Sequence, residues 1–177
     1  MMIRIKQFKK IALFIISVLL ISGMVYGGVE YSIGSNSLSG TVLDESTKLR
    51  WTRCSINDSG EGDATSSCVQ SHIKVTWENA LITCESLDFA GINDWRLPNV
   101  RELLSIVDYS EIVTPVVEKS VFPNTYDGKY WTSTTFNDNA SGTDDSADYA
   151  WSVDFQYGNS NPESKTANYN VRCVTGP

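Results

Sequence analysis

Hydrophobic residues recur at helical spacing in the middle of the chain. The recurrence runs over 77–87, after Thr76, whose side chain suits an N-cap position. Phe89–Gly91 follows and ends the pattern. This spacing predicts an amphipathic helix with one buried stripe. The stripe consists of Trp77, Ala80, Leu81, Cys84 and Leu87.

A second apolar face begins at Val100 and continues through Leu103, Leu104 and Val107. Asn99 stands at the N-cap, and Glu102 falls three residues later, which is the spacing of a capping box. Pro98 prevents a helix from extending further back. The pattern therefore predicts a second helix that begins directly after Asn99.

Short runs of β-branched and aromatic residues lie on both sides of these helices. Such runs predict strands. Before the helices they are Thr41–Leu43 and Leu49–Arg53, with a turn at 44–46, and after them Tyr130–Thr135, Ala150–Phe155 and Tyr169–Val174. The polar stretches 137–148 and 158–164 are expected to be loops. The order predicts an α+β fold, with two helices packed on a small, mainly antiparallel, twisted sheet with long loops.

The N-terminus resembles an export signal. Four basic residues precede the apolar run Ile11–Val25, and small residues follow it. The run is short for a membrane span, so we expect cleavage near residue 27, with a retained N-terminal anchor as the alternative. No Cys follows the run, which argues against lipid anchoring there.

Behind the signal, residues 28–40 are rich in Gly and Ser and are expected to be a flexible lead-in to a domain at 41–177. The chain has 14 basic and 21 acidic residues, and four of the basic ones lie in 1–27. Removal of the signal leaves ten basic residues against 21 acidic ones, which gives a formal charge of −11. This charge opposes binding to nucleic acid, and membrane contact is expected only if the N-terminal segment is retained.

Four cysteines remain in the exported part: Cys54, Cys68, Cys84 and Cys173. An even number behind an export signal indicates two disulfides, and three pairings are open. We favour Cys54–Cys68, which would close a polar excursion, and Cys84–Cys173, which would tie the first helix to the final strand. A metal site is a weak alternative, because the chain has no Cys-x-x-Cys and His72 is its one histidine.

Several segments together resemble the Lcl C-terminal domain family, a bacterial domain of unknown function, from about Thr41 to Val174. The segments are LRWTRC, WENALITCESL, NDWRLPNVRELLSIVDYS, FPNTYDGKYWTSTT, YAWSVDF and NYNVRCV. The resemblance implies a C-type-lectin-like fold, distantly similar to the formylglycine-generating enzyme superfamily. It also implies a disulfide between the first helix and the last strand, at positions that match Cys84 and Cys173.

The family takes its name from a collagen-like adhesin whose C-terminal domain is associated with glycosaminoglycan binding and trimer formation. This chain has no collagen segment, and its negative charge disfavours sulfated polysaccharides. Formylglycine-generating chemistry needs spare thiols, whereas all four cysteines are explained by disulfides.

The segment Trp95-Arg96-Leu97-Pro98 allows two interpretations, an anion clamp or a structural corner. The neighbouring apolar residues favour burial, where an arginine must be paired. We therefore expect a structural role for Arg96, with Asp94 or Glu102 as its partner.

The five tryptophans allow a sugar-stacking platform or a core. Trp51, Trp77 and Trp95 are expected in the core, because aromatic side chains supply much of the buried area of a small domain. Trp131 and Trp151 begin strand runs beside long loops, and with Tyr149 they are the candidate ligand-binding residues.

Four aspartates of the 137–148 loop are candidate calcium ligands, since Ca²⁺ prefers hard oxygen donors. They are Asp138, Asp144, Asp145 and Asp148. Their spacing does not match the regular calcium-loop motif, and the lectin sequence Glu-Pro-Asn is absent. A solvated acidic loop without a cofactor is therefore the expected alternative.

Catalysis has little support, because His72 is accompanied by no nucleophile motif. We expect a non-catalytic, lectin-like binding or adhesion module that is exported to the periplasm, the cell surface or the medium. Its partner would be a glycan or a protein. The alternatives are a structural subunit of a surface assembly, with a trimer or other homo-oligomer as its form, and, less favoured, an enzyme on the same fold.

Overall fold

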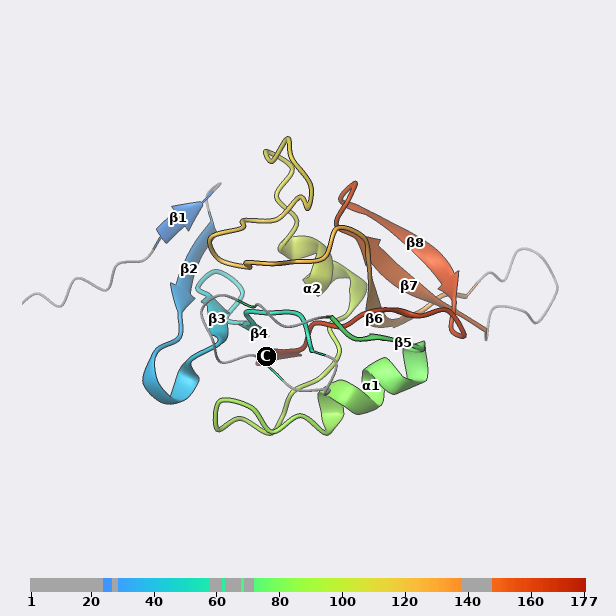
Figure 1. Ribbon diagram of the computed structural model, residues 1–177, viewed down its shortest axis with the longest axis horizontal. Helices are drawn as coiled ribbons and strands as arrows, with labels where there is room; N and C mark the ends of the chain where they lie inside the picture. The colour runs from blue at the N-terminus through green and yellow to red at the C-terminus, as the bar shows by residue number, and fades with distance from the viewer. Residues whose placement is uncertain (1–23, 27–28, 58–61, 63–67, 69–71, 138–147) are drawn as a thin grey trace, which may run out of the picture.

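Two five-stranded sheets and two short helices make up the fold (Figure 1). The computed structural model describes residues 24–26, 29–57, 62, 68, 72–137 and 148–177. The fold is α+β, as predicted, but its strands form two sheets rather than one.

The first sheet has the order β1-β2-β3-β4-β10 and is antiparallel throughout. Its strands are β1 (Met24–Tyr26), β2 (Val29–Ile33), β3 (Thr41–Asp44), β4 (Arg50–Thr52) and β10 (Val174–Thr175). The hairpin predicted around residues 44–46 is confirmed as the β3–β4 pair. A short 3₁₀ helix, η1 (Asn36–Leu38), connects β2 to β3.

The expectation of a flexible segment at 28–40 is wrong for residues 29–40. Val29-Glu-Tyr-Ser-Ile33 alternates apolar and polar residues, which is a strand pattern, and Tyr31 is buried. The neighbouring Gly and Ser residues hide this pattern in the sequence. β1 lies within the predicted export signal, whose residues 1–23 are outside the part of the chain described.

The second sheet has the order β5-β9-β6-β7-β8. Its strands are β5 (Lys74–Val75), β6 (Lys129–Thr135), β7 (Tyr149–Asp154), β8 (Asn159–Ser164) and β9 (Tyr169–Asn170). All pairs are antiparallel except β6 with β9, which run parallel at Tyr130 and Asn170. The strand predicted at 169–174 is thus two short strands, one in each sheet.

The loop predicted at 158–164 is wrong, because this segment is the edge strand β8. It has no strand composition of its own, but it pairs with β7 along its whole length, from Tyr149–Ser164 to Asp154–Asn159. Tertiary pairing therefore overrides local propensity here. Pro162 is tolerated because an edge strand needs no ladder hydrogen bond on its outer side.

Both predicted helices are present. In α1 (Trp77–Glu85), the buried stripe contains Ala80 and Cys84. Thr76 is extended at the N-cap, but its side chain makes no capping hydrogen bond. In α2 (Val100–Ser105), the predicted capping box is complete: Asn99 Oδ1 accepts from Glu102 N at 2.9 Å, and Glu102 Oε2 accepts from Asn99 N at 2.7 Å.

Buried apolar residues in the described ranges form two hydrophobic cores, and the C-terminal segment contributes to both. The first joins β2–β4 to α2 and includes Trp51, Leu103 and Val174. The second lies under α1 and includes Cys84 and Cys173. Figure 1 shows α2 between the two sheets and α1 along the lower side of the view.

Two disulfides join the pairs favoured from the sequence. Cys54–Cys68 spans 14 residues and Cys84–Cys173 spans 89 residues. The second bond fixes α1 to the segment that enters β10. Two disulfides are consistent with an extracellular or periplasmic protein. Within the part of the chain that the structure describes, no helix combines the length and apolar character needed to cross a membrane.

Candidate ligand-binding site

The Trp-Arg-Leu-Pro segment is a structural corner. Trp95, Leu97 and Pro98 are buried, and Arg96 exchanges two backbone hydrogen bonds with Val174, at 2.8 and 2.9 Å. The Pro98 carbonyl accepts from Ser133 N at 2.8 Å. The corner thus links β10, β6 and the start of α2.

Of the two expected partners of Arg96, Glu102 is the one found. Nη1 and Nη2 donate to its two carboxylate oxygens, each at 2.8 Å. Hydrogen bonding to Glu102 raises the pKa of Arg96 above its usual value. Burial acts against the charge on Glu102, but hydrogen bonds from Arg96 and Asn99 outweigh it and lower the pKa of that carboxyl. Two of the guanidinium nitrogens are thus held by Glu102, which supports the structural role of Arg96.

The three candidate aromatic residues occupy different environments. Trp131 has no exposed surface, and its Nε1 donates to Val75 O at 2.9 Å, so its assignment to a ligand surface is wrong. It is buried because its β6 position faces α1 and Tyr169. Trp151 is half-buried with its ring edge-on to Phe136, and Tyr149 is 39% exposed.

Of the four candidate calcium ligands, Asp148 is exposed, and its backbone carbonyl accepts from Lys165 N at 2.7 Å. The other three, Asp138, Asp144 and Asp145, lie outside the described residues. His72 pairs through its backbone with Asn57 and packs its ring edge against Tyr126, 6.0 Å between centroids.

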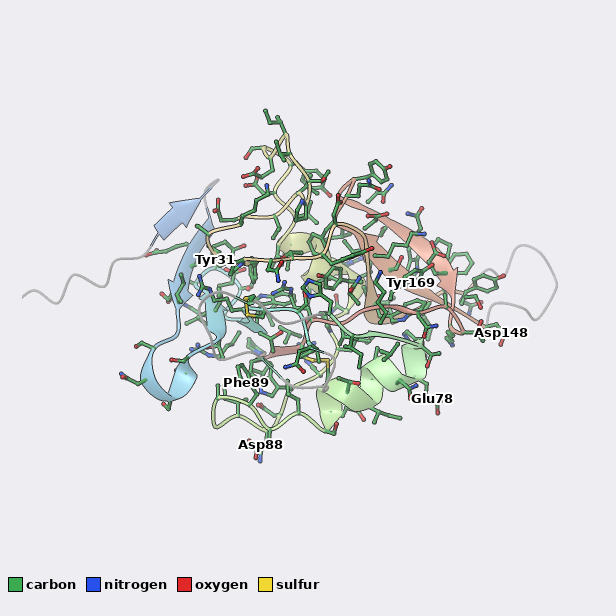
Figure 2. The ribbon with its side chains drawn as sticks, viewed as in Figure 1. Tyr31, Glu78, Asp88, Phe89, Asp148 and Tyr169 are labelled. Atoms are coloured by element: carbon green, nitrogen blue, oxygen red, sulfur yellow. A yellow bond between two sulfur atoms is a disulfide. The ribbon has the colours of Figure 1, made fainter. Side chains whose placement is uncertain are left out.

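A pocket of about 540 Å³ opens between the first turn of α1 and the turn that follows β8. Its lining residues are Thr76, Trp77, Glu78, Leu81, Lys165 and Thr166. Figure 2 shows Glu78 on α1 and Asp148 at the end of the second sheet, on the same side of the molecule. The pocket is therefore built from two segments far apart in sequence.

Hydrogen bonds hold these two segments in a fixed relation. Trp77 N donates to Lys165 O at 3.0 Å, and Trp77 Nε1 donates to Thr132 O at 2.8 Å. The second bond fixes the orientation of the indole against β6. Ser164 Oγ and Thr166 Oγ1 lie 2.9 Å apart, and Ala167 N donates to Ser164 O at 2.8 Å. These two contacts fix the turn after β8, which forms the side of the pocket opposite α1.

The pocket combines an apolar floor with charged and hydroxyl groups at its border. The Lys165 ammonium lies 4.4 Å from the centre of the Trp77 ring, a cation–π contact. Leu81 extends the apolar surface, while Glu78, Thr76 and Thr166 supply oxygen atoms. Trp77 was expected in the core. It is instead half-buried, with its indole contributing to the pocket wall.

The sequence contains only an indirect signal for this pocket. Trp77 stands at the first position of α1, where part of a large side chain remains outside the helix packing. Lys165, its partner, is 88 residues away, within a stretch that has no apolar pattern. The β7–β8 pairing and the hydrogen bond from Trp77 N to Lys165 O bring the two together.

The comparisons with known proteins agree with the segments quoted above. A profile of the Lcl C-terminal domain matches residues 40–175, which covers both sheets from β3 onward, both helices and the pocket. No curated protein matches the chain significantly. The chain belongs to the Lcl C-terminal domain family.

Proposed function

We propose that this protein is an exported, non-catalytic binding module with a lectin-like fold, and that its ligand is a glycan held in the pocket between Trp77 and Lys165. The observation that carries the proposal is the composition of this pocket. Ligand sites are typically concave and mostly apolar, with a few convergent polar groups. The six lining residues have that composition.

The chemistry of a saccharide fits this surface. A pyranose ring has an apolar C–H face, which packs on the indole of Trp77 and the side chain of Leu81, as aromatic surfaces favour. Its hydroxyls both donate and accept hydrogen bonds. Glu78 offers an acceptor, Lys165 a donor, and the threonine hydroxyls offer both.

The scaffold supports a preformed site, which lowers the cost of binding. The Cys84–Cys173 bond anchors α1 to the second core, and the Trp77–Thr132 hydrogen bond fixes the indole. The lectin-like fold rests on the family resemblance. It is supported by two disulfides, one of which links the first helix to the last strand.

A glycan array probed with the exported chain tests the proposal. We expect selective binding that falls at least tenfold in Lys165→Met and in Leu81→Asn. Lys48→Met is the matched control, because Lys48 is an exposed lysine on the β3–β4 turn, paired with Glu45. Near-ultraviolet circular dichroism reports whether each variant retains the native aromatic packing. Binding that survives both pocket substitutions in folded protein would contradict the assignment of this site.

A structural subunit of a surface assembly is the second candidate, favoured by one surface feature. Ile112 is 96% exposed and Val113 is also exposed, at the tip of the loop between α2 and β6. Exposed apolar residues in this arrangement favour protein contacts. Light scattering would distinguish the candidates: a defined oligomer that dissociates in Ile112→Ser supports assembly, and a monomer supports the binding module.

A further inference from the structure

The edge strand of the first sheet, β1, lies within the predicted export signal. It pairs antiparallel with β2, with Met24 opposite Tyr31 and Tyr26 opposite Val29. Figure 1 shows β1 outermost, with β2 between it and β3. Cleavage near residue 27, which the sequence predicts, would remove β1 and make β2 the edge of the sheet.

The β2–β3 pairing identifies the backbone groups that cleavage would open. Glu30 O accepts from Glu45 N at 2.9 Å, so the backbone groups of Glu30 face the side of β3. Successive residues of an antiparallel strand direct their N–H and C=O groups to opposite sides. The groups of residues 29, 31 and 33 therefore face the side of β1. They form a row of donors and acceptors that another strand can pair with.

The β2 edge has none of the sequence features that protect edge strands from pairing. Such strands are commonly protected by Pro or Lys. The edge strand of the second sheet, β8, contains Pro162, which has no backbone N–H. Residues 29–33, by contrast, contain neither Pro nor Lys. The two outer edges are therefore unlike, and β2 is the one suited to a further strand.

The sequence of β2 is suited to pairing with itself. Val29-Glu-Tyr-Ser-Ile33 is apolar at both ends and at its centre and polar between, so it has the same pattern in both directions. Antiparallel pairing of two copies centred on Tyr31 places Glu30 of each copy opposite Ser32 of the other. A register centred on Glu30 would instead place the two glutamates opposite each other, and like charges in that position are destabilising. Charge thus selects the register centred on Tyr31.

We propose that two exported chains pair through their β2 strands, antiparallel and centred on Tyr31. The contact is closed by a two-fold axis, the commonest symmetry of protein dimers. Strands β2, β3, β4 and β10 of each copy, four from each, would form one continuous sheet of eight. The proposal rests on the export proposed above and does not depend on the glycan site.

The dimer would leave both pockets open. Figure 1 places β8 and the start of α1 at the end of the molecule away from β1 and β2. Two pockets on one particle would bind a repeating glycan more tightly than one pocket does, because the second contact is made within the same complex.

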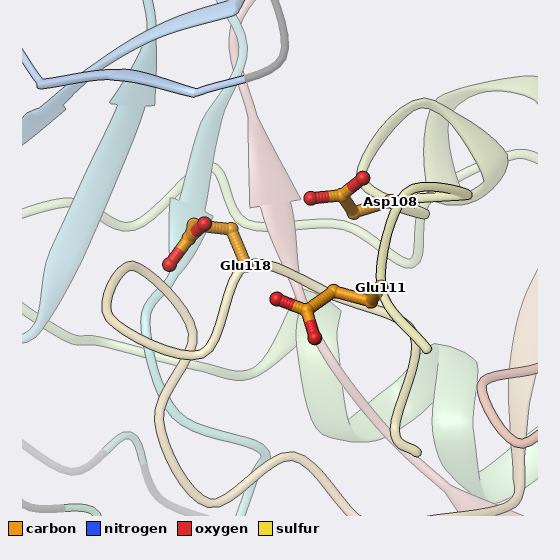
Figure 3. A group of neighbouring side chains, drawn as sticks. All are labelled: Asp108, Glu111 and Glu118. Carbon is orange, nitrogen blue, oxygen red and sulfur yellow. The ribbon is translucent and has the colours of Figure 1, made fainter. Parts of the chain in front are cut away.

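Negative charge opposes this association. Each exported chain carries a formal charge of −11, from ten basic and 21 acidic residues. Some of the charge is concentrated: Figure 3 shows Asp108, Glu111 and Glu118 together, with carboxylate oxygens within 4.8 Å of one another. Salt screens such repulsion, so the dimer should tighten as ionic strength rises. The contact is one short strand pair, so we expect a Kd on the order of 10–100 µM.

Mass spectrometry and sedimentation equilibrium of the exported product test the proposal. The full chain is expressed, and the product is purified after export. Its mass should show that it begins after Tyr26. Sedimentation equilibrium should give a monomer–dimer equilibrium, with a dimer that tightens between 0.05 and 0.5 M sodium chloride by about threefold or more. Ile112→Ser should leave this equilibrium unchanged, which separates the β2 contact from assembly through the loop between α2 and β6.

Substitutions at Ser32 test the register. Ser32→Ala is the reference, because it removes only the hydrogen bond from Ser32 Oγ to Glu45 Oε1. Relative to it, Ser32→Lys should tighten the dimer and Ser32→Glu should weaken it, each by about fivefold, because the two-fold axis repeats the contact with Glu30. Asn159→Lys and Asn159→Glu, at an exposed position of β8, make the same changes in net charge and should differ little from each other.

Three results would overturn the proposal. The first is an exported product that still contains β1. The second is a monomer up to about 0.5 mM protein at both salt concentrations, well above the expected Kd. The third is a dimer that responds equally to Lys and Glu at position 32, or that is lost in Ile112→Ser. Near-ultraviolet circular dichroism checks that each Ser32 variant keeps the native aromatic packing.

Discussion

Arg96 and Glu102 form a bidentate ion pair, with both of its N–O distances at 2.8 Å, across the Pro98–Asn99 corner. Glu102 also accepts from Asn99 N, so one carboxylate both caps α2 and holds the arginine. Because Arg96 exchanges backbone hydrogen bonds with Val174, this pair connects the start of α2 to β10.

Glu102→Gln should destabilise the fold and change its response to pH. The loss at pH 7 should be about 1–3 kcal/mol, toward the lower end because the Arg96 side chain is 38% exposed and solvent screens the pair. The pKa of Glu102 is lowered in the folded state, so its contribution is complete above the ordinary value of 4.5 and is lost as pH falls below that value. Urea denaturation at several pH values measures both effects.

Asp94→Asn is the control for that experiment, because Asp94 is an exposed carboxylate two residues from Arg96. It should leave the Arg96–Glu102 pair and the free energy of unfolding at pH 7 unchanged. Parent and Glu102→Gln proteins with the same stability loss between pH 5 and 3 would show that the ion pair contributes nothing to the acid response.

Removal of the two disulfides should have unequal effects. On the chain-entropy model, the cost of Cys84→Ala with Cys173→Ala is about 4–5 kcal/mol, because the closed loop is long. Cys54→Ala with Cys68→Ala should cost about 3 kcal/mol. Guanidinium denaturation of the two double variants gives the comparison, and an equal or reversed order would contradict the entropic account for this protein.

Arg172 is a fully buried arginine that depends on neutral acceptors. Nη1 donates to Thr52 O at 2.7 Å and Arg53 O at 2.6 Å, and Nη2 donates to Thr125 Oγ1 at 2.9 Å. Within the described part of the chain, no carboxylate pairs with it. Arg172→Lys should cost about 2–4 kcal/mol, because an ammonium cannot reproduce the planar fork.

Arg101→Lys, on the exposed side of α2, is the matched control and should change the free energy of unfolding by less than about 0.5 kcal/mol. Thermal and urea unfolding of both variants measures the difference. If Arg172→Lys proves as stable as Arg101→Lys, the planar arrangement of the guanidinium donors does not contribute to the stability of the core.

Gly158→Ala should cost more than Gly91→Ala. Both glycines have positive φ, +70° and +71°, so both variants acquire the left-handed penalty of about 1–2 kcal/mol. A Cβ at Gly158 would also lie 2.9 Å from Tyr109 Cε1 and Val107 Cγ1, whereas a Cβ at Gly91 would meet nothing within 4 Å. Equal melting temperatures for the two variants would show that the Tyr109 and Val107 side chains move away from the added Cβ without a loss of stability.

The predictable parts of this fold are those with local causes. The Pro98-Asn99-x-x-Glu102 spacing determines the start of α2, because each capping hydrogen bond is made within three residues. The stripe of α1 is likewise a local pattern. The disulfide pairing was favoured but not determined by the sequence, because four cysteines allow three pairings. The corner role of Arg96 was predictable because its flanking residues are apolar.

The rest depends on contacts between distant segments. β8 is polar and becomes a strand only by pairing with β7, and Trp131 is buried because α1 covers it. The pocket needs Trp77 beside Lys165. No local sequence pattern predicts these contacts between distant segments.

The segment 171–174 has a consequence for biogenesis. Val174 belongs to the first core, and Val171 and Cys173 belong to the second, so neither core can close in a growing chain until these residues have emerged. For the exported module proposed above, Cys84 would therefore await its partner until the last residues of the chain have been translocated. Thiol labelling of stalled chains that end before Val171 should find Cys84 reactive, and protection at that stage would contradict this sequence of events.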